Sequence, residues 1–197
     1  HALHATSEGA KRLLILSNDT DVMVIMLHFW SLCHAHGLEQ MWMRCGVGDS
    51  IRFVPIHTMA SKMGAPMCKI LPALHCLTGS DYTSKFGTKS AALKVADPEK
   101  YLEEFGCNID DVNFSKVEQF LVQLLKPGTH LQTLDQLRYY MYYQTKKTFA
   151  DLPPTSRSAT AHILRAFYAT HMLICCLTNS TLDPTDFGFY KDTDGLM

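Results

Sequence analysis

The sequence predicts an α/β portion followed by an all-helical portion, and three observations lead to this fold class. Residues 11–17, KRLLILS, form a continuous aliphatic run that is typical of a buried strand. A longer apolar segment, 20–36, separates this run from a second short strand-like segment, 39–45. From Pro66 onward the apolar residues recur at helical spacing. A chain of 197 residues can bury the core of one domain, or of a domain with an appendage.

The first long helix is expected over residues 20–36, directly after the first strand. Asn18 and Asp19 form a turn and helix-cap signal, and Gly37 marks the other end. Three β-branched aliphatic residues near the start of the segment leave a long strand as the alternative. The length of the segment and its cap favour the helix.

A third strand and a short helix complete the predicted α/β portion. Residues 46–50 are typical of a turn, and residues 51–56, IRFVPI, of a short strand. Residues 57–64 are expected to form one or two helical turns.

The helical portion contains six apolar segments, each bounded by glycine, proline or a capping residue. We expect helices over residues 66–77, 87–96, 97–105, 114–125, 131–146 and 158–177. Pro72 can kink the first of these helices, and Pro98 is expected at the first helical position of the third. Residues 150–158 are expected to be a linker, and residues 183–195 a loop.

The composition restricts the classes of function and location. A hydrophobic content of 47% and a charged content of 19% fit a globular protein, and no apolar run is long enough to span a membrane. The net charge of -1 gives no overall attraction to nucleic acid, so a binding surface for it must be local. Seven scattered cysteines without CxxC pairs predict reduced thiols and an intracellular location, with the nucleus as one candidate compartment. The chain begins without Met, inside a helical pattern, so we expect a fragment that lacks an N-terminal part.

Two aspartates follow the first strand and are the first candidate site. In open α/β sheets ligands bind outside the carboxyl ends of the strands, and Asp19 and Asp21 lie at such an end. Two carboxylates at this spacing require a cation to offset their repulsion, and hard ions such as Mg²⁺ prefer carboxylate oxygens. The alternative is that Asp19 only caps the helix and Asp21 complements its dipole. The local pattern by itself favours the cap.

A glycine- and lysine-containing segment is the second candidate site. Asp81 ends an apolar helix, and Lys85, Gly87 and Lys89 follow before the next helix. A glycine turn lets backbone N–H groups approach a phosphate, and lysines add positive charge there. Such an arrangement binds the nucleic-acid backbone without reading its sequence. An ordinary connection between helices with solvated lysines is the alternative.

Together the two segments resemble the flap-endonuclease branch of the PIN-like nuclease fold. That family has an acidic D-x-D cluster after a strand, as in Leu16-Ser17-Asn18-Asp19-Thr20-Asp21, and an L-x-G-[SC]-D-Y segment, as in Leu77-Thr78-Gly79-Ser80-Asp81-Tyr82. Its helix-two-turn-helix, which binds duplex backbone, corresponds to Lys85–Ala91. The chain is also similar to uncharacterised PIN-like proteins associated with mobile elements. Those carry a late P-[TS]-D-[FW]-G motif, here Pro184-Thr185-Asp186-Phe187-Gly188.

The resemblance implies a partial PIN-like three-layer domain, with a short, mostly parallel sheet and helices, followed by an all-helical region containing the helix-two-turn-helix. The implied division is a PIN-like α/β domain over 1–80, a helical region over 81–149, and a linker, C-terminal helix and tail over 150–197. The acids that the family has before its D-x-D cluster are missing here, and Lys85 replaces the first glycine of the usual G-x-G. The missing acids predict weak metal binding and poor cleavage, and Lys85 predicts a weaker hold on a monovalent cation and on phosphate.

The resemblance also assigns roles to residues. It implies a Mg²⁺- or Mn²⁺-dependent nuclease that hydrolyses phosphodiester bonds of DNA or RNA, with DNA the favoured partner and no membrane contact. The catalytic and metal-binding residues would be Asp19, Asp21 and Asp81, and the nucleic-acid-binding residues would be Lys85, Gly87, Thr88, Lys89 and Ser90. The alternatives are a catalytically degenerate nucleic-acid-binding domain, or an interaction domain of a mobile-element protein.

A tyrosine-rich segment is a further candidate for nucleic-acid contact. Aromatic rings with basic neighbours can stack on bases and hold a single strand. The amphipathic pattern of helices instead favours a segment that is half core and half surface. The residues concerned are Tyr139, Tyr140, Tyr142 and Tyr143, with Arg138, Lys146 and Lys147 beside them.

Overall fold

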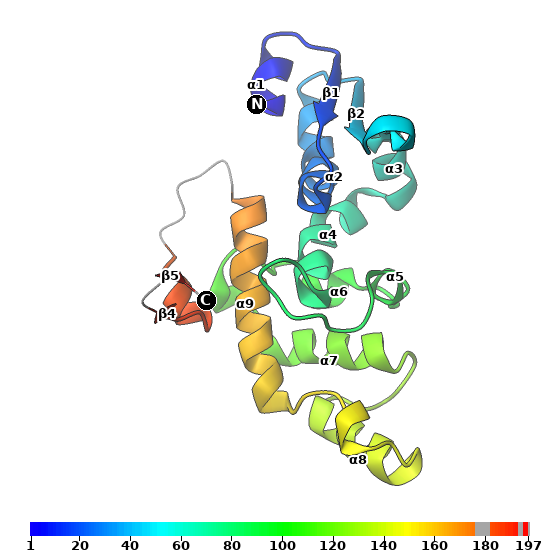
Figure 1. The fold of residues 1–197 in the computed structure, drawn as a ribbon, viewed down its shortest axis with the longest axis vertical. Helices are drawn as coiled ribbons and strands as arrows, with labels where there is room; N and C mark the ends of the chain where they lie inside the picture. The colour runs from blue at the N-terminus through cyan, green and yellow to red at the C-terminus, as the bar shows by residue number, and fades with distance from the viewer. Residues whose placement is uncertain (176–181, 193–194, 197) are drawn as a thin grey trace. The chain divides into compact units, whose positions relative to one another are not determined.

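The computed structural model describes residues 1–175, 182–192 and 195–196 (Figure 1). Contacts between Cα atoms divide the chain into unit 1, His1–Pro72, and unit 2, Ala73–Met197. The predicted boundaries after residues 80 and 149 stay predictions. Among the helices of the described ranges, none has both the length and the apolar character needed to cross a bilayer.

The elements follow the predicted order of an α/β portion and a helical portion. Unit 1 contains α1 (Ala2–Ser7), β1 (Arg12–Leu16), α2 (Thr20–Ala35), β2 (Gln40–Cys45), η1 (Gly48–Ser50), β3 (Arg52–Pro55) and α3 (Ile56–Met63). Helix α4 (Ala65–Thr78) contains the boundary between the units and has Pro72 in its interior. Unit 2 contains α5 (Lys89–Ala92), α6 (Glu99–Leu102), η2 (Ile109–Asp111), α7 (Phe114–Leu125), α8 (Leu134–Gln144), η3 (Phe149–Asp151), α9 (Ser156–Ile174), η4 (Pro184–Phe187), β4 (Lys191–Asp192) and β5 (Gly195–Leu196).

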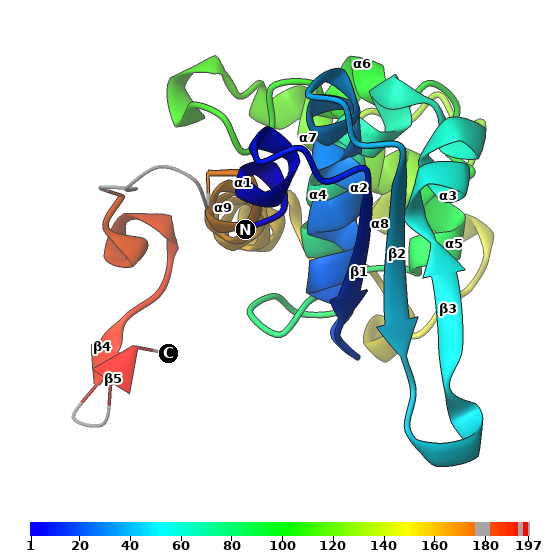
Figure 2. The same ribbon diagram turned by 90° about the horizontal axis from the view of Figure 1, so that it is seen from above.

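The sheet of unit 1 has the order β1-β2-β3 and is mixed, so the prediction of a mostly parallel sheet is wrong (Figure 2). Strands β1 and β2 are parallel, with Leu14 opposite Trp42, because α2 provides the crossover that parallel strands need. Strands β2 and β3 are antiparallel, with Arg44 opposite Phe53. Residues 46–51 between them are too short a connection for a parallel crossover.

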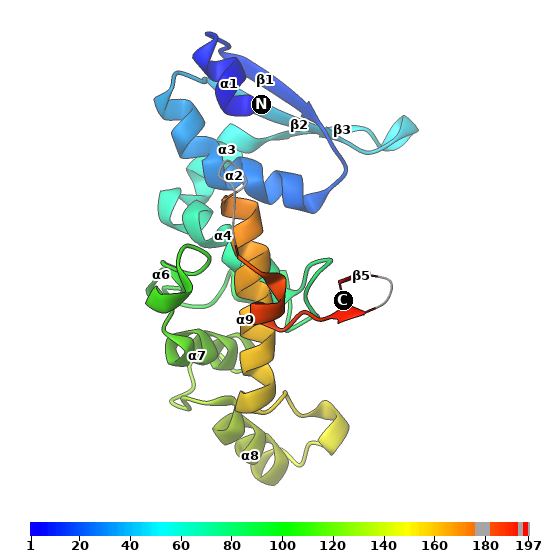
Figure 3. The same cartoon turned by 90° about the vertical axis from the view of Figure 1, so that its left-hand side faces the viewer.

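Helices α2 and α3 cover one face of this sheet (Figure 3). Met41 and Met43 of β2 are buried in one apolar cluster with Leu27 and Trp30 of α2. On β1, Leu14 and Leu16 alternate with the half-buried Leu13 and Ile15 and are exposed, as is Phe53 of β3. Within the described residues unit 1 therefore has two layers, a sheet and its helices, where a three-layer domain was expected.

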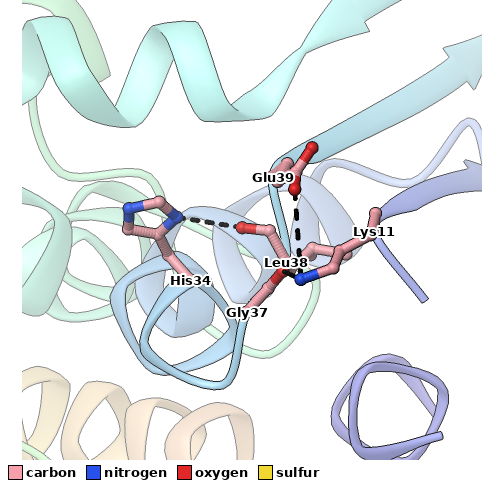
Figure 4. Close-up of polar contacts among 5 residues, drawn as sticks. All are labelled: Lys11, His34, Gly37, Leu38 and Glu39. Carbon is pink, nitrogen blue, oxygen red and sulfur yellow. Dashed lines mark hydrogen bonds and ion pairs between the residues drawn. The ribbon is translucent and has the colours of Figure 1, made fainter. Parts of the chain in front are cut away.

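Polar contacts hold the turn between α2 and β2 in place (Figure 4). Gly37 has φ +102 and lets the chain reverse after α2. The ammonium group of Lys11 donates to the carbonyl of Gly37 at 3.2 Å and lies 3.9 Å from the carboxylate of Glu39. His34 donates from Nδ1 to the carbonyl of Leu38 at 2.9 Å. The start of β1 and the start of β2 are thereby tied to the same turn.

Unit 2 is built around α7 and α9. Phe120 and Leu121 of α7 and Ile163 and Phe167 of α9 are each at most 2% exposed. The carboxylate of Glu118 accepts from the Leu134 N–H at 2.8 Å and from the Ser156 hydroxyl at 2.5 Å. One side chain of α7 thus holds the first residues of both α8 and α9.

Two predicted helices and the predicted tail differ from the structure. The helix expected over 87–96 is the single turn α5, and the one expected over 97–105 is α6, because Asp97 has φ +46 and interrupts the chain between them. Pro98 lies immediately before α6 and not at its first position. The predicted linker includes the first turn of α9, and the last positions of the helix expected over 158–177 lie outside the described residues.

The late P-T-D-F-G motif forms η4, and β4 pairs antiparallel with β5 beyond it, so unit 2 is not entirely helical. Phe187 is buried and stacks on Phe167 with ring centroids 5.7 Å apart. Arg165 donates to the carbonyl of Gly188 at 3.4 Å. The motif therefore packs its own segment against α9.

Candidate functional site

The first candidate region, the acidic turn, consists of residues 17–21, which follow β1 and include the first two residues of α2. Asp19 is the N-cap of α2, and its Oδ1 accepts from the Asp21 N–H at 2.9 Å. The Asp19 N–H donates in turn to the hydroxyl of Ser17 at 3.1 Å. One carboxylate oxygen of Asp19 is therefore used in a backbone hydrogen bond, as the capping alternative predicts.

Asn18 connects the acidic turn to the end of β2. The sequence predicts a turn at Asn18 but not this connection. Its Oδ1 accepts from the Gly46 N–H at 2.6 Å. Gly46 has φ +90, and a Cβ there would lie 2.1 Å from the carbonyl oxygen of Ser50. The Ser17 N–H also donates to the carbonyl of Arg44 at 3.1 Å, which extends the parallel ladder by one residue. The carboxyl ends of β1 and β2 are thus held together by a side chain and a glycine.

The three predicted metal ligands do not lie in one unit. Asp19 and Asp21 belong to unit 1, and Asp81 belongs to unit 2. In the part of the chain that the structure describes, no group of three or more His, Cys, Asp or Glu side chains is arranged to hold a metal ion. The acidic turn supplies two carboxylates, one of them already bonded to a backbone N–H. By itself the acidic turn therefore supplies two of the three acids expected for a Mg²⁺ or Mn²⁺ site.

The second candidate region, the glycine–lysine loop, consists of residues 78–90 of unit 2 and starts with a tight turn. The Thr83 N–H donates to the Ser80 carbonyl at 3.2 Å, and the Ser80 N–H donates to the Thr83 carbonyl at 3.3 Å. The buried hydroxyl of Thr83 donates to the Cys76 carbonyl at 2.7 Å, which joins the turn to α4. Asp81 and Tyr82 occupy the exposed tip of this turn.

Two glycines allow the loop to fold closely on itself and on α7. Gly79 has φ +120, and a Cβ there would lie 2.9 Å from the Cα of Lys85. Gly87 has φ +68, and a Cβ there would lie 3.0 Å from the side chain of Leu124. A larger residue at either position would have to displace its neighbours.

The loop encloses an open concavity of about 430 Å³. The residues that line it are Thr78, Gly79, Ser80, Thr83, Lys85, Gly87, Thr88 and Lys89. Four of the five predicted nucleic-acid-binding residues are thereby brought together, and none of the lining residues is acidic. Ser90 is adjacent, with its hydroxyl 3.3 Å from that of Thr88.

The two lysines of the concavity have different surroundings. Lys89 lies 2.7 Å from Nδ1 of the buried His75, and because an ammonium group can only donate, the histidine nitrogen is the acceptor. Lys85 is exposed and has no ion-pair or hydrogen-bond partner among the described residues. Lys89 is thus held in place, whereas Lys85 presents a solvated charge.

Phe86 anchors the centre of the loop between these lysines. Its ring is buried and stacks on His162 of α9 with centroids 5.4 Å apart, and its N–H donates to the Thr78 carbonyl at 3.1 Å. His162 donates from Nε2 to the Leu77 carbonyl at 2.9 Å. Burial lowers the pKa of His162, and the nearby charge of Arg165 lowers it further, while the bond to Leu77 acts in the opposite direction. A neutral imidazole therefore supports the loop.

Thr88 caps α5, since its hydroxyl accepts from the Ala91 N–H at 3.1 Å. Helix α5 is a single turn, so its dipole contributes little to the attraction of a phosphate. The charge at the concavity comes from the two lysines.

Comparison of the chain with protein-family models, with curated proteins and with solved structures finds no match. The likeness to PIN-like nucleases therefore depends on the motifs of the sequence. The mixed α/β architecture by itself does not single out that family.

Proposed function

We propose that this protein binds the phosphate backbone of nucleic acid, with DNA as the favoured partner, through the concavity of the glycine–lysine loop. The main support is the set of residues that line the concavity. This set combines Lys85 and Lys89 with hydroxyl groups and two glycines, and it contains no acid. Lysine ammonium and hydroxyl groups donate to phosphate oxygens, and glycines let the backbone come close. Such contacts fix position on the duplex and carry no sequence information.

The test is the salt dependence of DNA affinity, measured by fluorescence anisotropy on a labelled duplex between 50 and 200 mM KCl. Each phosphate contact contributes roughly 0.9 to the slope of log affinity against log salt. Replacing both lysines, Lys85→Ala with Lys89→Ala, is expected to weaken binding and to reduce the slope by about 1 to 2. The matched control, Lys94→Ala with Lys116→Ala, removes two exposed lysines of the same unit that do not line the concavity.

Equal affinities and equal slopes for the two double variants would reject the proposal. A slope that falls only with the control pair would place the contact elsewhere on unit 2. Binding of inorganic phosphate at low millimolar concentration in a calorimetric titration, with no binding of duplex, would reject nucleic acid and identify a small phosphate-containing ligand as the occupant.

A metal-dependent nuclease is the second candidate function. It is supported by the position of Asp19 and Asp21 at the carboxyl edge of the parallel pair β1–β2, where ligands bind in open α/β sheets. Together with Asp81 they would hold a divalent ion that activates water for phosphodiester hydrolysis. This candidate requires the two units to share one site.

Calorimetric titration with Mn²⁺ tests the nuclease candidate. Asp19→Asn retains a capping oxygen while removing the charge, and Asp81→Asn removes the charge on the exposed turn. If the three acids share an ion, each variant weakens Mn²⁺ binding and the double variant is no worse than the more damaging single one. Independent effects of the two substitutions, or the lack of any Mn²⁺ binding by the unaltered chain, would reject it.

A further inference from the structure

A cluster of exposed aromatic rings lies on α8 and the segment that follows it. Tyrosine in globular proteins is intermediate in burial, whereas these rings expose between two fifths and three quarters of their residue surface. The exposed fractions are 65% for Tyr139, 40% for Tyr142, 61% for Tyr143 and 73% for Phe149. The buried side of the helix is formed instead by Leu134 and Leu137. The helix is thus half core and half surface, as the amphipathic pattern predicts, but its buried half contains leucines and its exposed half carries the aromatic rings.

The four rings form a continuous series of contacts. Tyr139 and Tyr143 have centroids 4.5 Å apart, and Tyr142 and Tyr143 have centroids 5.0 Å apart. Phe149 of η3 joins the series at Tyr142, also at 5.0 Å. We refer to Tyr139, Tyr142, Tyr143 and Phe149 as the aromatic platform.

Backbone and side-chain bonds hold the segment after α8 against its last turn. The Lys147 N–H donates to the Met141 carbonyl at 3.2 Å. The Thr148 hydroxyl donates to the carboxylate of Asp151 at 2.6 Å, which closes the turn that carries Phe149. The platform is therefore preorganised, which lowers the entropic cost of binding a ligand.

The charges around the platform are mainly basic. Lys146 and Lys147 lie in the segment between Tyr143 and Phe149, and neither has an ion-pair partner among the described residues. Two acids lie on the same segments and are hydrogen-bonded, Asp151 to the Thr148 hydroxyl and Asp135 to the Ser156 N–H at 3.1 Å. A ligand suited to this surface has flat apolar faces and negative charge.

We propose that the aromatic platform stacks the bases of single-stranded nucleic acid, with Lys146 and Lys147 contacting its phosphates. This proposal rests on the proposed function only in taking nucleic acid as the class of ligand. The two sites are otherwise separate, since the concavity is proposed to bind the backbone and the platform the bases. Bases stack on aromatic side chains with little sequence preference, since every base has a flat π face. A protein partner would also use exposed tyrosines, but the unpaired lysines favour a polyanion.

The experiment compares two labelled 15-mers by anisotropy, oligo-dT and an abasic oligomer with the same number of phosphates. The unaltered chain is expected to bind oligo-dT at least about tenfold more tightly, since stacking strengthens binding by roughly that factor per base. Tyr139→Ala with Tyr143→Ala should bring the two affinities together, while Tyr139→Phe with Tyr143→Phe should keep the preference. Tyr190→Ala, which removes an exposed ring outside the platform, is the matched control.

The outcomes separate this proposal from the proposed function. Equal binding of oligo-dT and abasic oligomer by the unaltered chain overturns the platform, whatever the duplex result for Lys85 and Lys89. Binding of neither oligomer, with duplex binding intact, overturns the platform alone. Loss of self-association in the Tyr→Ala double variant, with no change in oligomer affinity, would overturn base stacking and show that the platform is a contact between copies of this chain.

Discussion

The acidic turn of unit 1 and the glycine–lysine loop of unit 2 are both polar segments that lead into a helix, and their side chains are used differently. In the acidic turn, Asp19 and Asn18 accept hydrogen bonds from the backbone. In the loop, backbone and hydroxyl groups hold the fold, and Lys85 is left without a partner among the described residues. A polar side chain whose atoms already bond to the backbone has less capacity to bind a ligand. The loop is therefore the better candidate for a binding site.

The largest expected effect concerns the glycine that joins the acidic turn to β2. Gly46→Ala would place a Cβ 2.1 Å from a backbone carbonyl oxygen at φ +90, so we expect unit 1 to lose about 3 kcal/mol or more of unfolding free energy. Both tryptophans, Trp30 and Trp42, lie in unit 1. Denaturant unfolding followed by tryptophan fluorescence therefore measures the unfolding free energy of unit 1.

Gly48→Ala is the matched control for this substitution. Gly48 also has a positive φ, +56, but no atom lies within 4 Å of the position that a Cβ would take, so only the left-handed backbone cost of about 1 kcal/mol applies. Equal losses for the two variants would show that the connection between the strand ends is not a tight contact.

The next effect concerns the corresponding glycine of the glycine–lysine loop. Gly79→Ala would bring a Cβ to 2.9 Å from the Cα of Lys85, and we expect a loss of about 2 kcal/mol together with weaker duplex binding. Gly128→Ala, at φ +72 with open space around it, should cost about 1 kcal/mol and leave binding unchanged. Far-UV circular dichroism and duplex anisotropy, measured where both variants are folded, give the two readouts. Unchanged binding by Gly79→Ala would separate the loop conformation from the proposed function.

A smaller effect distinguishes the cap from the ligand at Asp19. Asp19→Ala removes the acceptor for the Asp21 N–H and is expected to destabilise unit 1 by about 1 kcal/mol. Asp19→Asn keeps a capping oxygen and should stay within a few tenths of a kcal/mol of the unaltered chain. Tryptophan fluorescence in denaturant measures both. A large loss for the asparagine variant would mean that the charge itself stabilises the turn.

The elements that the sequence predicts well are those whose pattern is local. The aliphatic run of β1 and the amphipathic segment of α7 have boundaries within one residue of expectation. The expectation that the strand is buried is wrong for one face, since Leu14 and Leu16 are exposed. The resemblance implies a mostly parallel sheet, and this is wrong for β3, because the short connection after β2 requires an antiparallel strand. The sequence predicts the break between α5 and α6 at Asp97, but it does not predict that each of these helices is only a single turn.

The sequence predicts which residues make up the glycine–lysine loop site, but it does not predict which hydrogen bonds and ring contacts these residues form. Gly87, Lys85 and Lys89 are expected to gather, and the concavity contains all three. The contact of Lys89 with His75 and the stack of Phe86 on His162 join residues that are distant in sequence, and no spacing rule indicates them. Whether an aspartate after a strand caps a helix or binds an ion depends on where its oxygens point, which the pattern D-x-D leaves open.

The smallest expected effect is a difference in pH dependence between the two units. Burial is the main cause that lowers the pKa of His162 in unit 2, and it also lowers that of the half-buried His28 in unit 1. In the unfolded chain both have the ordinary histidine pKa of about 6.5. Below that pH the unfolded state binds a proton that the folded state does not, so the unfolding free energy falls as the pH decreases toward the folded pKa and is constant above the unfolded one.

His162→Gln tests which histidine is responsible for the pH dependence of unit 2. Glutamine retains a donor for the Leu77 carbonyl without titrating, so the decrease in helical stability between pH 7.5 and 5.5, followed by far-UV circular dichroism, should become smaller. His28→Gln, the matched variant in unit 1, should instead flatten the dependence seen by tryptophan fluorescence. Because His162 is the more deeply buried of the two, its substitution should have the greater effect. The pH dependence of helical unfolding could also be the same with and without His162. That result would mean that other groups titrate with folding, and that the neutral imidazole under Phe86 does not make the loop sensitive to acid.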